Sequence, residues 1–125
     1  MKTRILIVDD NALFREGLKM LINHESDMEA VAEAENGEVA VRLARKLRPD
    51  IILMDVKMPV MDGIEATRQI ITEMPEMKIL ALSMYSSDGF LSRMMQAGAL
   101  GYILKGDDFK ELSGDIRRAM GIESL

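Results

Sequence analysis

Five polar residues follow or end short apolar runs, and their types could do chemistry together. They are Asp9, Asp10, Asp55, Ser83 and Lys105. Three carboxylates brought to one place would raise each other's pKa unless a cation lay among them. Mg²⁺ suits such a group, because it prefers oxygen ligands and keeps several waters. A carboxylate beside Mg²⁺ could attack phosphorus and form an acyl phosphate, with a lysine ammonium and a serine hydroxyl contacting the phosphoryl oxygens.

The same five residues also have an ordinary interpretation. An aspartate or serine after a strand is usually a turn or helix-cap residue, and a lysine there is usually solvated. Taken singly, each residue would therefore have a low chance of taking part in chemistry. Their joint occurrence at the ends of successive apolar runs favours a common site.

The elements that must position these residues alternate along the chain. Five short apolar or β-branched runs are typical of strands, and several are apolar on both faces, as buried parallel strands are. We predict strands at Arg4–Val8, Met28–Ala34, Ile51–Met54, Lys78–Ser83 and Gly101–Leu104.

The intervening stretches show helical spacing of apolar residues. One apolar stripe begins at Phe14, a second lies behind Asn36 as N-cap, and a last begins at Phe109 behind Asp107 or Asp108. The other two helices are predicted at Gly63–Glu73, before Pro75, and at Asp88–Ala97, closed by Gly98.

Strands that alternate with helices through short connections predict an α/β fold with five flanking helices. We expect a doubly wound five-stranded parallel sheet in the flavodoxin-like order 2-1-3-4-5, and one domain over residues 1–125. In such sheets a ligand binds outside the carboxyl ends of the strands, where strand order reverses. The five polar residues all fall at that edge.

Composition excludes several classes of function. The 125 residues include no cysteine, which excludes a disulfide scaffold, a thiolate metal site and a cysteine nucleophile. With a net charge of −5 and no basic stripe, nucleic-acid binding through this domain is not expected. The apolar run Ile5–Val8 ends at Asp9, too early for a signal peptide or membrane span, so we expect a cytoplasmic protein.

A family resemblance rests on five segments that cover nearly the whole chain in order. The segments are Ile5–Asp10, Ile51–Asp55, Met58–Gly63, Leu80–Ser83 and Ala97–Lys105. They resemble the signature segments of response regulator receiver domains of two-component systems. The last segment is most similar to the NarL/FixJ-like subgroup, whose output domains usually bind DNA. The resemblance therefore implies a piece of a longer transcription regulator, with DNA as a partner of an output domain outside this chain.

The resemblance implies a role for each site residue. Asp55 would accept a phosphoryl group from a sensor histidine kinase, and Lys105 would pair with the phosphoryl oxygens. Mg²⁺ would be bound directly by Asp10, through water by Asp9, and also by Asp55 and the backbone carbonyl of Lys57. The protein would then be a signalling switch that catalyses only its own phosphorylation and dephosphorylation.

The resemblance also implies a conformational switch. Ser83 would move toward the phosphoryl group and Tyr102 would rotate inward behind it, which changes the face formed by the fourth helix, fifth strand and fifth helix. Homodimerisation on phosphorylation is a further expectation. Without the resemblance, Tyr102 would be interpreted as an edge residue with a solvated hydroxyl.

Other classes of function compete with this one. A Mg²⁺-dependent phosphohydrolase typically carries a second acid two residues after its aspartyl nucleophile, where this chain has Lys57. A flavin or nucleotide binder would need a Gly- or Ser/Thr-rich loop after the first strand, in place of Asp9-Asp10-Asn11. A stand-alone receiver, or a receiver-like interaction module that is never phosphorylated, stays open as the alternative.

Overall fold

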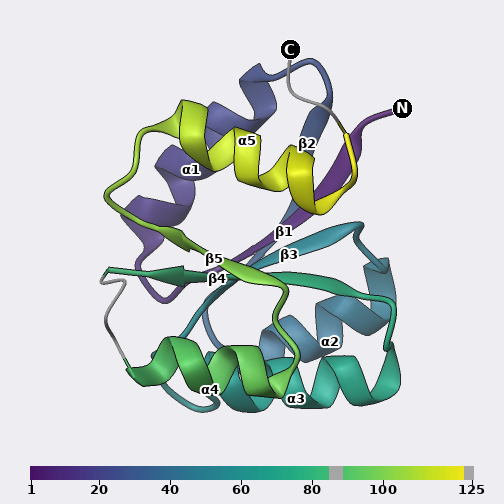
Figure 1. Cartoon of the computed structure of the whole chain (residues 1–125), viewed down its shortest axis with the longest axis vertical. Coiled ribbons are helices and arrows are strands. Elements are labelled where there is room, and N and C mark those ends of the chain that lie inside the picture. Colours follow the sequence, from purple (N-terminus) through teal and green to yellow (C-terminus); the bar gives the residue numbers. More distant parts are fainter. Residues whose placement is uncertain (85–88, 123–125) are drawn as a thin grey trace.

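The computed structural model describes residues 1–84 and 89–122, and strands alternate with helices throughout this part of the chain (Figure 1). The strands are β1 Thr3–Val8, β2 Met28–Ala34, β3 Ile51–Asp55, β4 Lys78–Ser83 and β5 Gly101–Leu104. The helices are α1 Ala12–His24, α2 Gly37–Leu47, α3 Gly63–Glu73, α4 Gly89–Ala97 and α5 Phe109–Ala119.

The predicted elements are all confirmed, with small changes at their ends. β1 starts one residue earlier than predicted, at Thr3, and β3 extends to include Asp55. The α4 helix is described from Gly89, and its predicted first residue Asp88 lies outside the described residues. These shifts leave the positions of the candidate site residues unchanged.

Polar caps set the helix starts as the sequence indicated. Asn36 accepts a hydrogen bond from the Val39 amide at the start of α2, at 2.9 Å. Of the two candidates for α5, Asp108 is the cap, and it accepts from the Glu111 amide at 2.9 Å. After α4 the chain turns at Gly98, whose φ of +122° is a conformation that favours glycine.

The sheet is parallel and has the predicted order, β2-β1-β3-β4-β5. Figure 1 shows α1 and α5 on one face of the sheet and α2, α3 and α4 on the other. The chain runs from β1 to the outer strand β2 and then crosses to β3 on the opposite side of β1. Strand order therefore reverses between β1 and β3, which places a ligand-binding edge at their carboxyl ends.

Helices on both faces explain why β1 and β3 are apolar throughout. Leu6 and Ile52 lie in one core cluster with residues of α2, α3 and α4, whereas Ile5 and Ile51 lie in the other, with residues of α1 and α5. All four side chains are fully buried. Each such burial contributes roughly 1.5–3 kcal/mol, so the two central strands are firmly fixed beneath the polar residues that follow them.

None of the helices in the described ranges combines the length and apolar character needed to cross a membrane.

Candidate functional site

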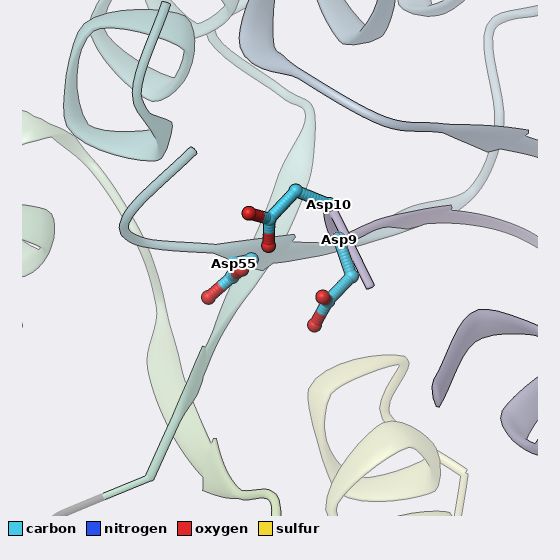
Figure 2. A group of neighbouring side chains, drawn as sticks. All are labelled: Asp9, Asp10 and Asp55. Carbon is cyan, nitrogen blue, oxygen red and sulfur yellow. The ribbon is translucent and has the colours of Figure 1, made fainter. Parts of the chain in front are cut away.

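The carboxylates of Asp9, Asp10 and Asp55 meet at the carboxyl ends of β1 and β3 (Figure 2). Val8 pairs with Met54 across the two parallel strands, so the residues that come next, Asp9 just after β1 and Asp55 at the end of β3, lie at the same edge. One carboxylate oxygen from each of the three aspartates lies within 4.8 Å of the others. The sheet register thus brings together three residues that the sequence places far apart.

Lys105 supplies a positive charge to two of the three carboxylates in this cluster. Its Nζ lies 2.6 Å from Asp9 Oδ2 and 3.2 Å from Asp55 Oδ1. The backbone of Lys105 is fixed by a hydrogen bond from its N–H to the Ser83 carbonyl, at 2.8 Å, which joins the ends of β4 and β5. The predicted convergence of Asp9, Asp55, Ser83 and Lys105 at one edge is therefore present.

Burial and like charge shift the ionisation of Asp55. Burial of its carboxyl and the neighbouring Asp9 raise the pKa of Asp55 to about 6, although Lys105 acts in the opposite direction. Burial of the Lys105 ammonium works against its charged form, but pairing with Asp9 and Asp55 outweighs this and raises the pKa of Lys105. The single lysine thus compensates the negative charge only in part.

The two carboxylate oxygens of Asp9 have different partners. Oδ1 accepts a hydrogen bond from the Asn11 amide at 2.9 Å. Oδ2 is buried and accepts no well-aligned hydrogen bond from the described residues, and its close contact with Lys105 is an ion pair. A buried carboxylate oxygen with spare acceptor capacity, beside two further carboxylates, fits a hard divalent cation such as Mg²⁺.

The loop after Asp55 forms one wall of a cleft over the cluster. The cleft has a volume of about 280 Å³ and is lined by Asp10, Asp55, Val56, Lys57, Leu82, Ser83, Met84 and Lys105. Asp62 accepts from the Glu65 amide at 2.9 Å and so caps α3 at the far end of this loop. Lys57 lines the cleft while its Nζ lies 4.3 Å from the centre of the Phe90 ring on α4.

The two residues of the predicted switch lie in different environments. Ser83 is buried at the end of β4 and lines the cleft. Tyr102 lies on the edge strand β5, is 46% exposed, and is not among the residues that line the cleft. In this conformation Tyr102 is therefore directed outward, whereas Ser83 is already at the site.

Three residues with contacts at the site were not identified from the sequence. Arg15 donates to the backbone carbonyl of Asp9, and the Phe14 ring lies 5.1 Å from the Lys105 ammonium. Phe90 contacts Lys57. An arginine and two phenylalanines on amphipathic helices carry no signal of such contacts, because these depend on how α1 and α4 pack on the sheet.

Comparison with known proteins identifies the family. Residues 5–117 match the family model of the response regulator receiver domain. The chain is 45% identical, over 104 residues, to the transcriptional regulatory protein DegU of Brevibacillus brevis, covering 83% of this chain and 44% of DegU. The chain spans about half the length of the curated relatives it matches, for example 44% of DegU.

Solved structures show the same relationship. A LuxR-family two-component response regulator from Aurantimonas sp. SI85-9A1 superposes with a TM-score of 0.90 at 36% identity, covering 100% of this chain and 90% of that one. The receiver domain of a Pseudomonas aeruginosa sensor histidine kinase, with a magnesium ion coordinated in its active site cleft, gives a TM-score of 0.87 at 30% identity, covering 97% and 99%. The chain belongs to the response regulator receiver domain family of two-component signalling systems.

Proposed function

We propose that Asp55 accepts a phosphoryl group from the phosphohistidine of a sensor histidine kinase. An Asp55 carboxylate oxygen would form a bond to phosphorus while the bond from phosphorus to the histidine nitrogen breaks. The observation that carries the proposal is the position of Asp55 in a cleft, beside two further carboxylates and the Lys105 ammonium at 3.2 Å. A slow attack by water on the resulting acyl phosphate would restore the carboxylate.

Asp9, Asp10 and Asp55, with the backbone carbonyl of Lys57, would hold Mg²⁺. The convergent carboxylates and the buried Asp9 Oδ2, which has an ion pair with Lys105 but accepts no well-aligned hydrogen bond from the described residues, support this ligand set, with Asp10 as a direct ligand and Asp9 through water. When bound, Mg²⁺ would stabilise negative charge on the phosphoryl oxygens and relieve repulsion among the carboxylates.

Lys105 and Ser83 would contact the transferred group. The Lys105 ammonium is held by Asp9 and Asp55, so a phosphoryl oxygen on Asp55 would arrive next to an existing positive charge. Ser83 lies at the end of the neighbouring strand β4 and lines the same cleft, where its hydroxyl could donate to a second oxygen. Both residues would favour the phosphorylated state over the free carboxylate.

The signal would leave the site through β4 and β5. Movement of Ser83 toward the phosphoryl group would open space for Tyr102, and so change the face formed by α4, β5 and α5. That face could then support homodimerisation, or control a DNA-binding output segment outside this chain. The transcriptional regulators that this chain resembles, over about half of their length, support the second role.

One receiver domain over residues 1–125 is supported by the single sheet with helices on both faces and by the family match over residues 5–117. Its only catalytic activity would be its own phosphorylation and dephosphorylation.

Intact mass spectrometry after incubation with MgCl₂ and acetyl phosphate tests the proposal. Wild type should gain the mass of one phosphoryl group, and Asp55→Ala should gain none. Asp10→Asn should gain it more slowly, because it removes a carboxylate from the cation site but leaves the acceptor in place. A gain that persists in Asp55→Ala would show that another residue is the acceptor.

A further inference from the structure

Arg15 joins the site to the outer strand β2. Its Nη1 donates a hydrogen bond to the backbone carbonyl of Asp9 at 2.5 Å, and its Nε donates to Glu33 Oε1 at 3.2 Å. The Arg15 side chain is 15% exposed and that of Glu33 is 30% exposed, so the contacts are partly shielded from water. One guanidinium on α1 thus connects the turn after β1 with a carboxylate on β2.

The Asp9 residue is tied to β2 on both sides of its α-carbon. Its N–H donates to the Ala34 carbonyl at 3.0 Å, and its own carbonyl is held by Arg15, which Glu33 anchors one residue before Ala34. The carbonyl of Asp9 and the amide of Asp10 belong to one planar peptide unit. Holding the Asp9 oxygen therefore fixes the plane from which the Asp10 residue begins.

Asp10 depends on this backbone restraint more than its neighbours do. Asp9 and Asp55 each have side-chain contacts with Lys105, and Asp9 has a further one with the Asn11 amide. The carboxylate of the exposed Asp10 has no hydrogen bond or ion pair with any residue in the described ranges. Its direction toward Asp55, visible in Figure 2, is set by its backbone and rotamer alone.

We infer that Arg15, anchored by Glu33, is a positioning residue for Asp10. It fixes the Asp9–Asp10 peptide so that the Asp10 carboxylate already lies beside Asp55 before a divalent cation binds. The inference rests on the proposed function, since it concerns the affinity of that cation site. It adds a residue outside the ligand set whose contribution is geometric.

Charge and geometry make opposite predictions for Arg15. A guanidinium close to the site repels a cation, so by charge alone its removal would tighten Mg²⁺ binding. If Arg15 acts by holding the ligand, its removal weakens binding, and loss of a residue that orients a ligand typically lowers metal affinity about 10- to 100-fold. The sign of the change therefore distinguishes the two roles.

The test is a titration of the metal-free protein with MgCl₂, in which binding is monitored through the NMR chemical shifts of the backbone amides. Arg15→Gln should raise the Kd for Mg²⁺ by about 10-fold or more. Lys19→Gln is the matched control, because Lys19 lies on the same helix and contacts the same Glu33 at 3.4 Å, but has no hydrogen bond or ion pair with Asp9. It removes the same charge and should leave the Kd within about twofold of wild type.

Two further measurements distinguish a role of Arg15 in positioning Asp10 from a general loss of structure. The Asp10 amide signal of the metal-free protein should move in Arg15→Gln and stay in place in Lys19→Gln, with both variants folded by circular dichroism. Arg15→Lys keeps the positive charge but loses the planar guanidinium that holds the Asp9 carbonyl and Glu33 together. It should also raise the Kd for Mg²⁺, and it serves as the test if Arg15→Gln does not fold.

The outcomes are distinct. An unchanged or tighter Kd in folded Arg15→Gln, with wild type binding Mg²⁺, overturns the inference and leaves the proposed function standing. A wild-type protein that binds no Mg²⁺ contradicts the proposed function, and the inference with it.

Discussion

A β-carbon placed on Gly63 would lie 1.9 Å from the backbone carbonyl oxygen of Asp55. Gly63 is the first residue of α3, and its N–H donates to the Val56 carbonyl at 2.8 Å. The start of α3 therefore packs directly on the backbone of the proposed phosphoryl acceptor. Only a residue without a side chain allows this approach, which makes Gly63 part of the device that positions Asp55.

Gly63→Ala should destabilise the protein and displace Asp55. Neither the Asp55 carbonyl nor the helix start can move without disturbing the other, and overpacking of this kind costs about 3 kcal/mol. Urea unfolding should show the loss, and acetyl phosphate labelling of the folded fraction should slow. Gly17→Ala is the control. Gly17 lies in the interior of α1, and a β-carbon there would have no neighbour within 4 Å beyond its chain neighbours and the nearby backbone of the helix. It should stabilise by up to about 1 kcal/mol.

Asp55→Asn should stabilise the metal-free protein, and the gain should depend on pH. The native pKa of Asp55 is raised from 3.8 to about 6, so between these values the native state holds a proton that the unfolded state releases. The free energy of unfolding of wild type therefore falls as pH rises through this window and stays lower above it. Asparagine mimics the protonated form and does not titrate.

The expected gain follows from the size of the shift. Each pKa unit corresponds to about 1.4 kcal/mol, so Asp55→Asn should gain on the order of 2–3 kcal/mol at about pH 7. The difference should vanish only well below the unfolded-state pKa of 3.8, where the carboxyl is protonated in both states. Urea unfolding over this pH range in the presence of a chelator measures it. A gain that is the same at all pH values would show that ionisation of Asp55 is not its source.

Much of the fold followed from the chain's own pattern. The runs Ile5–Val8 and Ile51–Met54 are apolar on both faces because helices cover both sides of β1 and β3. Once these are parallel neighbours, Asp9 and Asp55 must emerge at one edge. The positions of the central site residues could thus be predicted from strand ends alone.

Other features of the site depend on tertiary packing and could not be predicted in this way. The Arg15–Glu33 contact joins α1 to β2 through the angle at which the helix crosses the sheet. Tyr102 lies exposed on the edge strand, as it was interpreted without the family resemblance, but no residue pattern indicates whether its ring can adopt an inward rotamer as well.

Arg117→Gln should destabilise the protein at neutral pH and lose this effect in acid. Arg117 of α5 contacts Asp27 at 2.9 Å and Glu25 at 2.8 Å, in the connection between α1 and β2. Its hydrogen bond holds the pKa of Asp27 below the ordinary 3.8. The pair therefore contributes stability above that value, and this stability is lost as pH falls through the lower native pKa.

The size of this effect is limited by solvent, because the Asp27 side chain is 36% exposed. We expect Arg117→Gln to lower the free energy of unfolding by about 1 kcal/mol at neutral pH, as measured by urea unfolding. The difference from wild type should become smaller below about pH 4. Arg118→Gln is the matched control on the same helix, since Arg118 is 65% exposed and pairs only with Asp115 one turn away among the described residues. An equal loss in both variants would mean that net charge, not the contact with Asp27, is responsible.

Phosphorylation should bury Tyr102. Ser83 and Tyr102 lie on the paired strands β4 and β5, with Ser83 at the cleft and Tyr102 46% exposed at the sheet edge. If Ser83 moves toward a phosphoryl group on Asp55, the space it leaves admits the ring. The chain has 2 tyrosines, so Tyr85→Phe leaves Tyr102 as the single source of tyrosine fluorescence. Quenching of its fluorescence by acrylamide should fall when acetyl phosphate and MgCl₂ are added.

Two controls in the Tyr85→Phe background connect that change to the proposed switch. Asp55→Asn should show no change in quenching, because the acceptor is absent. Ser83→Ala should still gain a phosphoryl group by mass, but should change its quenching less, because it lacks the hydroxyl that draws β4 toward the site. Unchanged quenching in a protein that mass spectrometry shows to be phosphorylated would contradict rotation of Tyr102. The signal would then have to leave the site by a route other than β5, such as the contact between Lys57 and Phe90 on α4.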